Sequence, residues 1–161
     1  MKEVVLIPQE RINVLKDKKT KDKIEKELNV KLTIEENIIE IDGGGLTLFQ
    51  AKNIVKAIGR GFSPEKAFRL LNEDEEIEII ELKGFTDKKL RVIKSRLIGT
   101  KGKARKEIEK CSGCSVSIYG KTVSLIGNYK QIGVAREAIN MIIRGSKHSK
   151  VYGFLQMAKS G

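Results

Sequence analysis

The chain has no tryptophan and only one histidine, and aromatic residues make up 5% of its 161 residues. So few aromatic side chains argue against a surface that recognises nucleic-acid bases mainly by stacking. With one histidine and no evident Ser/His/Asp or Cys/His set, the usual general base of enzyme catalysis is scarce. The sequence therefore favours a protein that is not an enzyme, and we nominate no catalytic residue.

Cysteines are equally few. Cys111 and Cys114 have the C-x-x-C spacing found in zinc sites and redox motifs. A structural zinc site needs about four ligands, however, and the chain offers no second pair. We interpret the two residues as reduced thiols in a turn, and we expect neither a metal nor another cofactor.

Long apolar stretches are also missing. No run of apolar residues is long enough to cross a bilayer. The apolar run near the start, VVLIP, gives way to charged residues, whereas a signal peptide needs a longer apolar core. We therefore expect a cytoplasmic protein without a membrane partner.

Positive charge is abundant and unevenly placed. The net charge is +11, and residues 87–161 contain 17 Lys or Arg against 4 Asp or Glu, whereas residues 1–86 contain 15 against 17. Between residues 88 and 106, nine side chains are basic and none is acidic. Solvated helix faces usually mix both signs, so this run around two glycines indicates a phosphate-binding surface.

The chain contains an internal repeat, which a shift of 84 residues reveals without gaps. Ile24-Glu25-Lys26 falls on Ile108-Glu109-Lys110, and Arg60-Gly61 falls on Arg144-Gly145. Apolar periodicity in each copy predicts the order strand, helix, loop, helix, strand, strand, helix. We therefore predict an α+β fold with two tandem units, residues 1–71 and 72–161, each a three-stranded sheet packed by three helices.

The two copies differ in the loop between their first two helices. The second copy has Gly99-Thr100-Lys101-Gly102, and glycines without a Cβ let a sugar–phosphate backbone approach closely. The helix that follows points free N–H groups at that backbone. We predict that this G-x-x-G loop binds the backbone of a single-stranded nucleic acid. The predicted contacts are Lys101, Lys103 and Arg105 on phosphates, Lys94 and Arg96 alongside, and Ile98, Val116 and Ile118 in an apolar groove for bases.

The first copy has no glycine at the corresponding place. Its stretch KDKKTKDK, residues 16–23, is shorter and carries side chains where the second copy has none. We predict a degenerate first unit that packs against the second, binds protein or contacts RNA only loosely.

A G-x-x-G loop between two helices, followed by V-x-I and a long final helix, resembles a type I KH domain. A degenerate first unit and a basic second unit resemble the archaeal and eukaryotic pre-ribosomal KH proteins of the Dim/Pno type. Residues 57–71, 96–127 and 135–159 carry this resemblance. It implies a factor that binds the 3′ region of small-subunit ribosomal RNA and assists its maturation. The implied partners are a Nob-type endonuclease and the α subunit of initiation factor two.

Two questions stay open at this level. The protein binds single-stranded RNA as its main function, or it is a scaffold that recruits a nuclease or translation factor, with RNA binding secondary. In the C-terminal tail, Lys147, His148 and Lys150 either extend the RNA-binding surface or are solvated charge. We expect Tyr152, Leu155 and Met157 to dock on the second unit.

Overall fold

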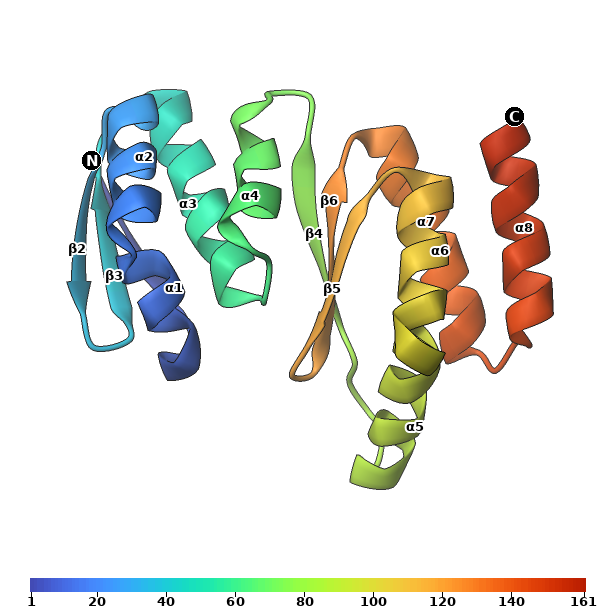
Figure 1. Ribbon diagram of the computed structural model, residues 1–161. Coiled ribbons are helices and arrows are strands. Elements are labelled where there is room, and N and C mark those ends of the chain that lie inside the picture. The colour runs from blue at the N-terminus through green and yellow to red at the C-terminus, as the bar shows by residue number, and fades with distance from the viewer. The chain divides into compact units, whose positions relative to one another are not determined.

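The computed structural model describes all 161 residues, and the chain divides into two compact units, residues 1–73 and 74–161. In each unit three antiparallel strands form a sheet whose central strand is the last of the three along the chain. Helices cover one face of each sheet (Figure 1). The predicted α+β architecture with two three-stranded sheets is confirmed.

The first unit has a core between its sheet and its three main helices. β1 pairs with β3, and β3 pairs with β2. Ile39 and Ile41 alternate with exposed or half-buried neighbours along β3 and are fully buried, so one face of the sheet packs on the helices. The elements are β1 (Lys2–Leu6), a 3-10 turn (Gln9–Arg11), α1 (Ile12–Lys16), α2 (Lys18–Leu28), β2 (Lys31–Glu35), β3 (Ile38–Asp42), α3 (Gly45–Gly59), α4 (Pro64–Ala67) and a second 3-10 turn (Phe68–Leu71).

The second unit repeats this order, with one long final helix in place of the short α4 and the 3-10 turn that end the first unit. Leu97, Ile108 and Leu125 are almost fully buried and join the first two helices to the sheet. Side chains cap two of its helices, because Thr86 accepts the Lys89 N–H and Asn128 accepts the Gln131 N–H. The elements are β4 (Glu76–Glu81), α5 (Asp87–Ile98), a 3-10 turn (Thr100–Gly102), α6 (Lys103–Ser112), β5 (Ser115–Tyr119), β6 (Thr122–Gly127), α7 (Tyr129–Ile143) and α8 (His148–Ser160).

The C-terminal tail is a helix, α8, that runs beside α6 in the same direction (Figure 1). Val151 and Leu155 are fully buried in the core of the second unit, and Tyr152 packs against that core. Met157 is 77% exposed, so the expectation that it docks is wrong. The side chains that dock recur every three or four residues, which places them on one face of the helix.

Candidate nucleic-acid interface

The G-x-x-G loop joins α5 to α6, and each of its two positions requires a glycine for a different structural reason. Gly99 has φ 75° and ψ 173°, a conformation essentially restricted to glycine. A Cβ at Gly99 would also lie 2.7 Å from the backbone nitrogen of Ala104. Gly102 has φ 75° and ψ 15°, and a Cβ there would meet nothing closer than 3.7 Å. Gly99 therefore lets the loop pack on α6. Gly102 allows the left-handed backbone turn and leaves the surface of the loop open at that point.

The N-terminal end of α6 is open to an anion. Its N-cap residue is Gly102, so no side chain bonds to the first N–H groups of the helix. The first turn contains no acidic residue, and Lys103 is exposed there. The partial positive charge of a helix N-terminus and these free N–H groups favour a phosphate.

The predicted cations are not equally available. Lys101 and Lys103 are exposed, and Lys94 is half-buried. Arg105 is engaged by Glu109, whose carboxylate lies 2.7 Å from the Arg105 Nη1 and also accepts the Val116 N–H at 2.9 Å. The loop therefore offers Lys101 and Lys103 as its freest charges, with Arg105 partly neutralised.

Arg96 has an unexpected position. Its guanidinium donates to the carbonyl oxygens of Ile142, at 3.0 Å, and of Ser146. These carbonyls lie at the end of α7 and in the connection to α8, so Arg96 joins α5 to that connection. The sequence showed the charge of Arg96 but not these acceptors, which are 46 and 50 residues away along the chain.

Two of the three predicted groove residues have surface to offer. Ile98 is 38% exposed at the end of α5, and Ile118 is half-buried in β5. Val116 is only 3% exposed and lies in the core with Ile108. Ile98 and Ile118 therefore keep apolar surface accessible, whereas Val116 is part of the core.

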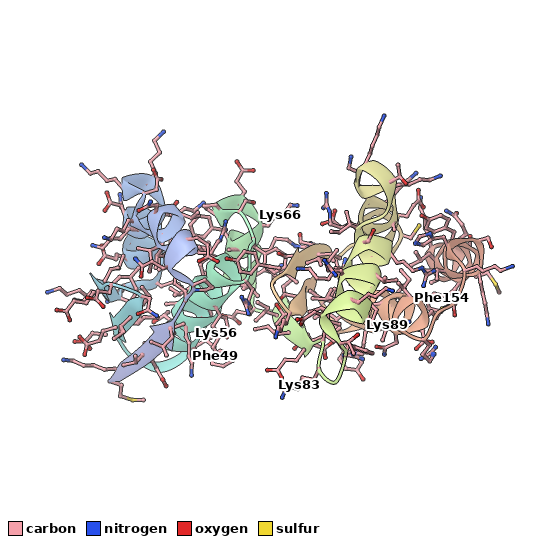
Figure 2. All side chains as sticks on the ribbon, turned by 90° about the horizontal axis from the view of Figure 1, so that it is seen from below. Phe49, Lys56, Lys66, Lys83, Lys89 and Phe154 are labelled. Carbon is pink, nitrogen blue, oxygen red and sulfur yellow. The ribbon has the colours of Figure 1, made fainter.

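Basic residues continue along α5, away from the loop. Lys88 and Lys89 in its first turn are exposed, and Figure 2 shows Lys89 on this helix and Lys83 in the segment before it. Lys83 is paired with Glu81 at 2.6 Å, which raises the pKa of Lys83 through a hydrogen bond and charge attraction. The uncompensated charge therefore begins on α5 and reaches the G-x-x-G loop.

The first unit has no comparable loop, because Asp17 alone separates α1 from α2. The Asp17 carboxylate accepts the Thr20 N–H at 3.3 Å and so caps α2. A negative charge therefore occupies the helix end that would face a phosphate. The missing glycines do not reveal this cap, but an Asp directly before a helix is a known N-cap signal.

Other kinds of site find less support in the structure. No three His, Cys, Asp or Glu side chains are grouped so that they could hold a metal ion. Cys111 and Cys114 are buried and form no disulfide, and burial raises the pKa of Cys111, with a smaller effect from Glu107. None of the helices is both long and apolar enough to cross a membrane.

Comparisons with known proteins agree with this geometry. A model of the second KH domain of Pno1 proteins, described as a eukaryotic-type KH domain (KH domain type I), matches residues 76–160. A KH domain-containing protein of Methanocaldococcus jannaschii is 40% identical over 96% of this chain and 72% of its own length. The pre-rRNA-processing protein pno1 of Aspergillus fumigatus is 31% identical over 83% of this chain, which spans 57% of that protein.

Solved structures match over nearly the full length. Dim2p from Pyrococcus horikoshii has a TM-score of 0.92 and 47% identity, covering 98% of this chain and 99% of its own. A complex of a/eIF2alpha, aDim2p and rRNA from the same organism matches with the same score and identity, covering 99% of this chain and 94% of the matched chain. From its sequence and its fold, the chain belongs to the family of Pno1- and Dim2-type KH-domain proteins.

Proposed function

We propose that this protein is a non-catalytic, cytoplasmic RNA-binding factor of ribosome assembly that binds the 3′ region of small-subunit ribosomal RNA. The relatives support this, since the Aspergillus protein is a pre-rRNA-processing protein and the Pyrococcus protein was crystallised with rRNA. The observation that carries the proposal is the structure of the G-x-x-G loop. A glycine stands at each end of the loop, no side chain caps the N-terminus of α6, and Lys101 and Lys103 are exposed.

In this proposal, the RNA backbone lies across residues 99–102. The N–H groups at the start of α6 bind one phosphate, while Lys101 and Lys103 neutralise its neighbours. The bases then point toward Ile98 and Ile118, which offer apolar contact without aromatic stacking. Lys94 and Arg105 add to the positive potential, and Arg96 holds the end of α5 in place.

Partner proteins form the second part of the proposal. The Pyrococcus relative was crystallised with a/eIF2alpha, which supports the initiation factor two α subunit as a partner. A Nob-type endonuclease is the other partner that we propose. The first unit exposes Val4 and Leu6 on the same face of β1, at 58% and 67%, which favours a scaffold role for this unit beside RNA binding in the second.

Fluorescence anisotropy with a labelled oligonucleotide from the 3′ end of small-subunit rRNA tests this proposal. The test variant is Thr100→Asp/Lys101→Asp, which places two like charges against the phosphates at exposed positions of the loop. Lys159→Asp/Ser160→Asp is the matched control, because it changes the net charge equally at the far end of α8. A scrambled strand measures sequence preference.

We expect tight binding that prefers the rRNA sequence, is lost in the loop variant and persists in the control. If roughly four to six phosphates are contacted, log affinity falls with log salt with a slope of about −3 to −4. Equal and weak binding of both strands, indifferent to the loop variant, would refute RNA binding through the loop and would favour protein recruitment as the main function.

A further inference from the structure

The connection between α7 and α8 is fastened to the helix that enters the G-x-x-G loop. The His148 Nε2 lies 2.8 Å from the carbonyl oxygen of Arg96, in the last turn of α5. The Arg96 guanidinium in turn donates to the carbonyls of Ile142 and Ser146. These three hydrogen bonds place the first residue of α8 next to the backbone that leads into Gly99.

The second turn of α8 contacts the helix that leaves the loop. The rings of His148 and Tyr152 stack with centroids 5.8 Å apart and an angle of 11° between their planes. On the α6 side, the Lys103 Nζ lies 5.9 Å from the centroid of the Tyr152 ring. Burial raises the pKa of Tyr152, with a smaller effect from Glu107. The beginning of α8 thus touches both helices that flank the loop.

This end of α8 carries cations without internal partners. Residues 138–161 include no Asp or Glu, and the exposed Lys147 and Lys150 form no ion pair. Elsewhere in the unit, Arg136 pairs with Glu78 at 2.7 Å and Arg144 pairs with Glu137 at 3.1 Å. Unpaired like charges gathered around one loop repel one another, and a bound polyanion relieves that repulsion.

We propose that the first turn of α8, through Lys147 and Lys150, forms a second phosphate-binding site for the same RNA strand, beyond the nucleotides held by the G-x-x-G loop. This inference rests on the proposed function, because it extends the same RNA path. RNA is the occupant that fits, since the surface continues the loop and offers cations. The large apolar side chain that α8 exposes, Met157, lies at its far end.

RNA length separates this second site from the loop. A strand of four nucleotides fills the loop alone, whereas a strand of eight also reaches α8. We would measure the affinity of both strands against salt for wild type and for Lys147→Gln/Lys150→Gln. Lys130→Gln/Lys159→Gln removes two exposed lysines elsewhere on the same unit and is the matched control.

For the eight-nucleotide strand, we expect the test variant to reduce the steepness of the salt dependence by about 1.4, which is about 0.7 for each lost phosphate contact. At 0.15 M salt this corresponds to about a tenfold loss of affinity. The four-nucleotide strand and the control variant should show no such change.

Three results would overturn the second site. An equal loss for both strand lengths would show only a general field of positive charge, and an equal loss in the control variant would show the same. No loss with either strand would leave Lys147 and Lys150 for an acidic protein partner. Failure of the proposed function would look different. In that case Thr100→Asp/Lys101→Asp would bind the eight-nucleotide strand with the same affinity as wild type.

Discussion

Replacing each glycine of the G-x-x-G loop by alanine should separate packing from RNA contact. At Gly99 the alanine would occupy a backbone region that costs about 1–3 kcal/mol for other residues. Its Cβ would also press on Ala104, 2.7 Å from the nitrogen and 2.9 Å from the Cβ, which adds about 1–3 kcal/mol of overpacking. We expect Gly99→Ala to lower the free energy of unfolding by about 4 kcal/mol.

Gly102→Ala should be far milder. The left-handed conformation costs an alanine about 1 kcal/mol, and its Cβ would have 3.7 Å to the nearest side-chain atom, the Arg105 Nη2. The added methyl group faces the open side of the loop, where the RNA backbone should lie. We therefore expect Gly102→Ala to fold nearly normally and yet to lose RNA affinity.

Tyrosine fluorescence during urea unfolding gives the stabilities. All three tyrosines, Tyr119, Tyr129 and Tyr152, belong to the second unit and the chain has no tryptophan, so the signal reports that unit alone. Gly102→Asn adds a check, because asparagine tolerates the left-handed conformation better than alanine does. Equal losses of stability at Gly99 and Gly102 would refute the assignment of separate roles to the two glycines.

Two further predictions concern Arg96 and Cys111. Arg96→Lys keeps the charge but loses the two guanidinium donors that bond to the carbonyls of Ile142 and Ser146. Hydrogen exchange at the amides of Gly99 and Gly102 should therefore accelerate in the free protein. RNA affinity should fall, while its dependence on salt should keep the same slope. Near-normal affinity and exchange would refute the positioning role of Arg96. For Cys111, the raised pKa means that the folded state holds the thiol proton more tightly than the unfolded chain does. The free energy of unfolding should therefore fall as pH rises above about 8.5, the ordinary pKa of a thiol. Urea titrations followed by circular dichroism should show a weaker fall in Cys111→Ala. The same pH dependence in both proteins would contradict this origin.

The elements of the fold could be predicted from sequence because their signals are local. The predicted order of strands and helices is found in both units, and apolar and polar residues alternate along β2 and β3, within a few positions of the turn residues that end them. The sequence alone predicts no helix over α8, although Val151 and Leu155 are four residues apart. Arg96 shows the stronger limit, because a charged side chain near a glycine loop suggests a ligand until its distant backbone acceptors are known.

The repeat indicates which part of the unit the architecture requires and which part is free to change. Glu25 and Glu109 occupy equivalent positions, and each carboxylate accepts the N–H of the following strand, from Leu32 and Val116 respectively, both at 2.9 Å. Each also pairs with the basic residue four positions earlier, Lys21 or Arg105. This contact between helix and strand occurs in both units, whereas the segment before the helix is Asp17 alone in one unit and a G-x-x-G loop in the other. Because the Asp17 carboxylate already bonds to the start of α2 and repels phosphate, any RNA contact of the first unit has to use a different surface from the one in the second.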